Sequence, residues 1–258
     1  MRAFVLAATT LVVCATGAAA QDVAAHIAAG DAARCERNPA AATTHYREAL
    51  ALDSADYDAN WKLARVLVDQ GLMLPNAQKN RRDSLYAEAR ALAERAVRVN
   101  PNGADGHYMV AVSIGRVALN LGARERVRLA KVIRDEALRA TELNPRHDGA
   151  LHVLGRWNAE IQRLPGITKF FAKTFLGASI FNEATWPNAE NYLTQAVALD
   201  PTNIYHHLDL AEVLIDMDKP ADARPHLEHI AQMALGCDPM DPTYKTQAAA
   251  LLQRIASR

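Results

Sequence analysis

The chain has 258 residues, half of them hydrophobic, and its 29 Lys and Arg residues balance its 29 Asp and Glu residues. This balance excludes a net field that would draw the protein to nucleic acid or to an anionic membrane. Alanine is abundant and runs of Val, Ile and Thr are short, which favours an all-α chain. The sequence has no phosphate-binding glycine loop, GxSxG elbow or Cys/His nucleophile pair. We therefore expect no cofactor and no enzymatic activity.

The first twenty residues resemble an export signal. Arg2 precedes an apolar stretch that ends in the small residues AAA at 18–20. This pattern predicts a signal peptide over residues 1–20, cut after Ala20, and a mature chain that is periplasmic or secreted. The apolar stretch is shorter than a membrane-spanning helix requires.

Internal repetition defines the rest of the chain. Four similar stretches recur: EALALDS at 48–54, RAVRVNP at 95–101, RATELNP at 139–145 and QAVALDP at 195–201. Each is typical of a helix end, and the next helix carries an apolar residue beside a small one, as in Leu154-Gly155. A small residue here lets two helices approach closely. This is the helix A to helix B pattern of the tetratricopeptide repeat (TPR).

The pattern predicts an all-α, TPR-like α-solenoid of about five helix pairs. The three middle units exceed the standard ~34 residues, and their extra length lies between helix A and helix B. A C-terminal helix covers the exposed end of the stack. The expected repeats are about 21–54, 55–101, 102–145, 146–201 and 202–236, followed by a capping helix at about 241–257.

Two cysteines, Cys35 and Cys237, remain after residue 20. An exported pair can form a disulfide. However, these two lie in the first and last repeats, which an extended solenoid holds far apart. We therefore expect two free thiols.

Several longer segments resemble one known family. These are ARERVRLAKVIRDEALRATELNP, RHDGALHVLGRWNAE and IYHHLDLAEVLIDMDKPADARPHLEHI, in that order, with a Phe-rich insertion after the second. Together they resemble the regulator of microtubule dynamics family from about residue 40 to 256. The resemblance implies a helical-repeat fold, a non-enzymatic binding role and, in the eukaryotic relatives, association with microtubules. Export would keep this chain away from tubulin, so we expect a different partner.

Helix A of each repeat is expected to line a concave groove that binds a protein or peptide. Counting from the small residue of each repeat places one face of helix A toward this groove. An aromatic or His residue with an Arg from successive repeats suits an extended peptide with acidic groups or a terminal carboxylate. The candidates are Trp61, Arg65, Asp69, Tyr108, Arg116, His152, Arg156, Glu160, Glu212 and Asp216. The alternative is an ordinary solvated face of mixed charge.

The insertion in the fourth repeat holds Phe170, Phe171 and Phe175. Their helical spacing predicts a short amphipathic helix. We expect it to pack on the repeats. A contact with the partner is an alternative, and so is a peripheral attachment to an envelope membrane.

The nine histidines raise the question of a metal. His226 and His229 share one helix face, but no HExxH or comparable ligand set accompanies them. We therefore expect no metal site, and a metal- or small-molecule-binding enzyme is the least favoured class.

Overall fold

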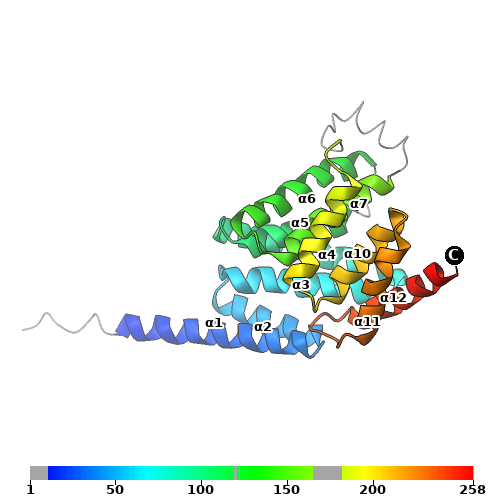
Figure 1. Cartoon of the computed structure of the whole chain (residues 1–258). Coiled ribbons are helices and arrows are strands. Elements are labelled where there is room, and N and C mark those ends of the chain that lie inside the picture. The colour runs from blue at the N-terminus through cyan, green and yellow to red at the C-terminus, as the bar shows by residue number, and fades with distance from the viewer. Residues whose placement is uncertain (1–10, 119–120, 122, 165–181, 258) are drawn as a thin grey trace, which may run out of the picture.

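The computed structural model describes residues 11–118, 121, 123–164 and 182–257. These residues form helices joined by short loops, with no strand among them (Figure 1). The all-α, TPR-like fold is confirmed. The first helices are α1 (Leu11–Cys35), α2 (Pro39–Leu52), α3 (Tyr57–Met73), the short 3₁₀ helix η1 (Asn76–Gln78), α4 (Lys79–Val99), α5 (Ala104–Ala118) and α6 (Ala123–Leu143). The remaining helices are α7 (Asp148–Arg163), α9 (Trp186–Leu199), α10 (Ile204–Asp216), α11 (Pro220–Gln232) and α12 (Asp241–Ala256).

The helices form two layers that curve together. Each helix A packs on its own helix B, giving the pairs α1/α2, α3/α4, α5/α6, α7/α9 and α10/α11. The first helices of successive pairs also contact one another, from α1 through α3, α5, α7 and α10 to α12. This second set of contacts creates a continuous inner layer. The helix A side chains of all repeats therefore share one surface.

Recurring Asp and Asn residues shape the turns between repeats. Asp53, Asn100, Asn144 and Asp200 each follow a helix B, and each side chain accepts a hydrogen bond from the backbone N–H two residues later. Such Asx turns compete with a further helical turn and so end the helix. The Asp and Asn residues of the recurring motif thus end each helix B by accepting a hydrogen bond from the backbone of the following turn.

Glycines allow close approach within pairs. A Cβ atom on Gly155 of α7 would lie 2.5 Å from Cγ of Leu193 on α9, and one on Gly30 would lie 2.5 Å from the Tyr46 ring. Leu193 and Tyr46 are themselves almost fully buried. Gly30 and Gly155 therefore set how closely helix A and helix B pack in the first and fourth pairs.

The two ends of the array meet. Cys35, the last residue of α1, forms a disulfide with Cys237 in the loop between α11 and α12, with an S–S distance of 2.05 Å. Arg37 also donates a hydrogen bond of 3.2 Å to the Gly236 carbonyl. Figure 1 shows the tip of the α1/α2 pair beside the α11–α12 connection. The expectation of two free thiols is wrong, because the stack curls until its ends touch and is not an extended solenoid.

The N-terminal half of α1 projects beyond the other helices (Figure 1) and crosses the predicted cleavage point after Ala20. Within the part of the chain that the structure describes, no helix has the length and apolar character needed to cross a membrane. The insertion with Phe170, Phe171 and Phe175 lies outside the described residues.

Replacing Gly155 with alanine tests the close packing of α7 on α9. We expect Gly155→Ala to lower the free energy of unfolding by about 1–3 kcal/mol, because the new methyl group overpacks against Leu193. Chemical denaturation of the purified variant measures this.

Gly115→Ala is the matched control, because its Cβ atom would lie an unstrained 3.9 Å from Ile133. This change should stabilise α5 by about 0.5–1 kcal/mol through helix propensity alone. Equal stabilisation by both substitutions would show that Gly155 is not required for packing.

Candidate functional site

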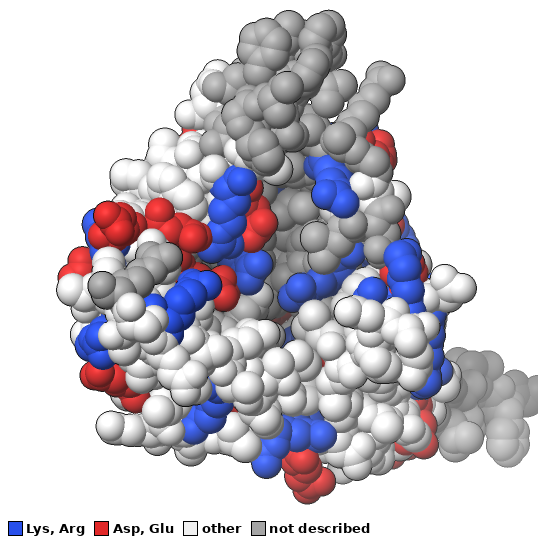
Figure 2. Space-filling model, turned by 90° about the vertical axis from the view of Figure 1, so that its right-hand side faces the viewer, with Lys and Arg blue, Asp and Glu red and all other residues white. Residues whose placement is uncertain are grey.

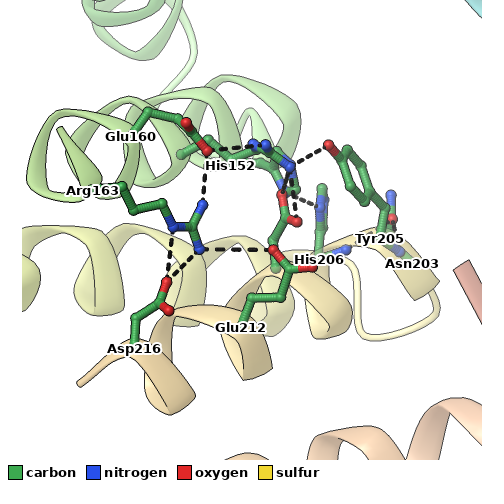
Figure 3. Close-up of polar contacts among 10 residues, drawn as sticks. His152, Glu160, Arg163, Asn203, Tyr205, His206, Glu212 and Asp216 are labelled. Carbon is green, nitrogen blue, oxygen red and sulfur yellow. Dashed lines mark hydrogen bonds and ion pairs between the residues drawn. The ribbon is translucent and has the colours of Figure 1, made fainter. Parts of the chain in front are cut away.

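All ten groove candidates lie on helices of the inner layer, namely α3, α5, α7 and α10. Those on α7 and α10 are brought together in one network of polar contacts (Figure 3). Those on α3 belong to a second group near the disulfide, and those on α5 lie between the two groups. From the side, the molecule shows a hollow with several Lys and Arg side chains around it (Figure 2).

Arg156 is the centre of the first group. Its Nη1 donates to both carboxylate oxygens of Asp209, each at 3.0 Å, and to the Tyr205 hydroxyl at 2.6 Å. Asp209 is buried, and burial alone would raise its pKa. Arg156 and His152 outweigh burial and bring the pKa of Asp209 to about 2. The pair therefore stays charged and joins α7 to α10.

His152 extends this network into the core. Its Nε2 lies 2.9 Å from Asp209, and its Nδ1 lies 2.8 Å from Nδ1 of His206. The other nitrogen of His206 donates to Asp148 at 2.9 Å. Burial lowers the pKa of His152 to about 4, although Asp209 acts in the opposite direction. His152 is therefore neutral near pH 7, which suits a buried structural role.

Arg163 links the other acidic candidates. Its guanidinium lies 2.7 Å from Glu160, 2.6 Å from Asp216 and 3.7 Å from Glu212. Figure 3 shows these carboxylates of α7 and α10 pointing toward Arg163 between the two helices. Burial raises the pKa of Glu212, and the nearby Asp209 adds to this effect. Carboxylates outnumber cations here, so the α7/α10 end of the inner surface is acidic.

A pocket lies where the first repeat meets the loop between α11 and α12. It has a volume of about 280 Å³ and lies against the disulfide. Its walls include Asp31, Arg34, Tyr46, Trp61, Lys62 and Arg65. Two of its cations are neutralised: Arg34 pairs with the buried Asp69 at 3.1 Å, and Lys62 pairs with Asp31. Burial raises the pKa of Asp69, against the opposing effect of Arg34.

Arg65 and Arg116 differ from the other arginines of the groove. The Arg65 guanidinium lies over the Trp61 ring, 5.8 Å from its centroid. Arg116 of α5 interacts with the hydroxyl of Tyr205. Burial and Asp209 raise the pKa of this hydroxyl, whereas Arg156 and Arg116 lower it. Within the described residues neither Arg65 nor Arg116 forms an ion pair with a carboxylate.

Tyr108 lies on the inner surface of α5, between the two groups. Its ring packs 4.8 Å from that of His147, measured between centroids. Burial raises the pKa of Tyr108 to about 12, so its hydroxyl stays protonated and can donate a hydrogen bond. Tyr108 therefore adds an aromatic wall with one polar end.

Sequence reasoning missed the residues that organise the groove. Arg34, Tyr205 and Asp209 contact the candidates but lie outside the positions counted from the small residue. The i, i+4 spacing of Tyr205 and Asp209 on one helix is a signal that could have found them. For Arg34 the sequence offers no signal, because its contact with Asp69 depends on how α1 meets α3.

These features define a class of protein. Paired helices, close-packed small residues and a shared inner surface are those of a tetratricopeptide-repeat solenoid. The chain belongs to the family described as regulator of microtubule dynamics protein 1-3, whose family model matches residues 26–256. The resemblance drawn from the sequence is confirmed.

Curated relatives carry the same family name. The chain is 27% identical over 162 residues to regulator of microtubule dynamics protein 1 of Bos taurus, covering 63% of this chain and 48% of that protein. For the Homo sapiens protein the identity is 26% over 145 residues, covering 56% and 45%. The chain thus spans about half the length of the curated relatives it matches.

Solved structures support the fold. A thermophilic TPR protein of Thermus thermophilus superposes with a TM-score of 0.65 at 19% identity, covering 90% of this chain and 99% of that one. PilF of Pseudomonas aeruginosa superposes with a TM-score of 0.52 at 15% identity, covering 93% and 94%. At these identities the likeness concerns the fold alone.

The buried His152 makes stability depend on pH. Its pKa is lower in the folded state than the ordinary value of 6.5, so the unfolded chain binds the proton more readily between pH 6.5 and about 4. Stability is therefore fully present above pH 6.5 and falls as the pH decreases, by at most about 1.4 kcal/mol per pH unit from this group. We expect His152→Gln to flatten this dependence in urea titrations at several pH values.

The control is His45→Gln, which replaces a partly exposed histidine on α2 in another repeat. It should keep the wild-type slope. A His152→Gln variant with an unchanged slope would mean that other groups cause the pH dependence.

Proposed function

We propose that the protein is a non-enzymatic scaffold that binds an extended peptide segment of a partner protein in its concave groove. The observation that carries this proposal is the pair of cations without carboxylate partners, Arg65 and Arg116, on the inner surface of the described residues. A charged guanidinium beside an aromatic ring is a strong binding group for a carboxylate. We infer that these two residues bind acidic groups of the peptide.

The pocket beside the disulfide suggests which part of the peptide enters it. A volume of about 280 Å³ admits one side chain or one chain terminus. Trp61 forms an apolar wall of the pocket, and Arg65 supplies a positive charge that no carboxylate of the described residues neutralises. The favoured occupant is the last residue of the peptide, with its carboxylate on Arg65.

The charge distribution of the groove gives the peptide a direction. Near α1 and α3 the groove holds the pocket cations, whereas the α7/α10 end has an excess of carboxylates. A peptide with its carboxylate terminus at Arg65 would direct basic or amino groups toward Glu160 and Asp216. Such charge complementarity mainly determines orientation and the rate of encounter.

Arg156 is assigned a different role from the other two arginines. Its charge is already neutralised by Asp209, and the buried aspartate would be left unpaired without it. Loss of one member of a buried ion pair typically costs about 3–5 kcal/mol. We therefore treat Arg156 as a residue that positions α7 on α10.

A binding experiment with matched peptides tests the proposal. Fluorescent random hexapeptides with a free C-terminal carboxylate should bind the wild-type protein more tightly than the same peptides with an amide terminus. The double variant Arg65→Gln/Arg116→Gln should lose at least about tenfold in affinity, since each charge-assisted hydrogen bond is worth about 1.5–3 kcal/mol. Fluorescence anisotropy measures both effects.

The double variant Arg95→Gln/Arg98→Gln is the control, because it removes the same charge from exposed positions on α4 in the outer layer. It should bind like the wild type. Wild-type affinity in a well-folded Arg65/Arg116 variant would refute the groove proposal, and so would indifference to the terminal carboxylate.

We also propose that the protein works outside the cytoplasm, in the cell envelope. The Cys35–Cys237 disulfide supports this location, since such bonds persist mainly in oxidising compartments. The amino-terminal pattern of Arg2, an apolar stretch and small residues supports it independently. The partner is then an envelope protein, whereas the names of the curated relatives refer to microtubules.

Thiol alkylation in intact cells tests the location. In a Cys14→Ser background, Cys35 and Cys237 should resist a maleimide probe until a reductant is added. A version lacking residues 2–20 should react at both positions, because it stays in a reducing compartment. Labelling of the full-length protein without reductant would contradict export.

A peripheral membrane role for Phe170, Phe171 and Phe175 stays a prediction from the sequence. These residues lie outside the described part of the chain, and no observation favours this role over the groove.

A further inference from the structure

Three side chains converge between α1 and α2. Nδ1 of His26 on α1 lies 3.0 Å from Oε2 of Glu48 on α2. Nδ1 of His45, one helical turn before Glu48, lies 3.2 Å from the same oxygen. One ligand atom from each of the three residues falls within 4.8 Å of the other two. Two helices thus direct two ring nitrogens and one carboxylate oxygen to a single point.

We propose that His26, His45 and Glu48 form a zinc-binding site. Imidazole nitrogens and a carboxylate oxygen are usual zinc ligands, with bond lengths of about 2.0–2.2 Å. Two ligands at those lengths and a tetrahedral angle are about 3.4 Å apart. The observed separations of 3.0 and 3.2 Å need only small side-chain adjustments to reach this geometry.

The other histidines already have structural roles. His107 and His207 each bond the carbonyl of a proline at the preceding turn, Pro101 and Pro201. His147 accepts a hydrogen bond from the backbone of Ala150 and caps α7. The remaining four lie in two clusters. His152 contacts His206, and His226 and His229 both contact His207. Among the described residues, none of these forms a three-ligand group with a carboxylate as His26 and His45 do.

The site is accessible to an ion from solution. The side chains of His26 and His45 are 34% and 37% exposed, and that of Glu48 is 47% exposed. Three protein ligands leave a fourth position for water, which is the pattern of an open zinc site. Nitrogen ligands disfavour magnesium and calcium, which prefer oxygen. A bound ion would also tie α1 to α2 close to the predicted cleavage point.

Zinc titration by calorimetry tests the site. The purified protein should carry no histidine tag, keep its disulfide and contain Cys14→Ser, because a free thiol also binds zinc. We expect one zinc equivalent with micromolar affinity or better, and a higher melting temperature in its presence. His45→Ala and Glu48→Gln should each weaken binding by at least about tenfold. Magnesium should have no effect.

His229→Ala is the matched control, because it removes an exposed histidine from another repeat. It should leave both the affinity and the zinc-induced melting shift unchanged. The three positions are partly exposed, so circular dichroism should show folded variants. Failure of the wild-type protein to bind zinc would overturn the proposal, and so would equal binding by His45→Ala.

Discussion

The disulfide between Cys35 and Cys237 joins the first repeat to the segment that precedes the capping helix. In an open solenoid each repeat contacts only its neighbours, so the two ends are independent. Here a cross-link closes a loop of about two hundred residues, for which the chain-entropy account predicts a stabilisation of up to about 5 kcal/mol. The curvature of the inner layer is fixed as a result, and the concave face becomes a hollow with a pocket at the junction of its two ends.

Within this ring, buried charges fix how the inner helices sit against each other. Arg156 and Asp209 join α7 to α10, and Arg34 and Asp69 join α1 to α3. Each pair includes a buried carboxylate, which would be costly without its arginine. Arg34 and Arg156 thus hold the inner helices together, whereas Arg65 and Arg116 have no carboxylate partner among the described residues.

The two proposed sites use different parts of the same first repeat pair. The pocket is lined by Asp31, Arg34 and Tyr46 of this pair, and the zinc ligands are three other residues of α1 and α2. Both depend on α1, the helix that begins within the predicted export signal. Removal of residues 1–20 would leave His26, Asp31, Arg34 and Cys35 in place, so the mature chain retains every α1 residue used by either site.

Much of this architecture could be read from the sequence. The repeat is specified by local signals, each of which acts over a few residues. These are the Asp and Asn residues that end each helix B, the apolar–small pairs and the spacing of the helix A face. The sequence therefore determined the all-α repeat fold and the helices that carry the groove. It could not determine the curvature, because small differences in packing between neighbouring repeats add up along the whole array. Only the tertiary structure decided that Cys35 meets Cys237, because the accumulated curvature brings the two ends together. It also decided that Arg156 is neutralised by Asp209 and that His26 lies beside Glu48, because each of these contacts depends on how two separate helices pack.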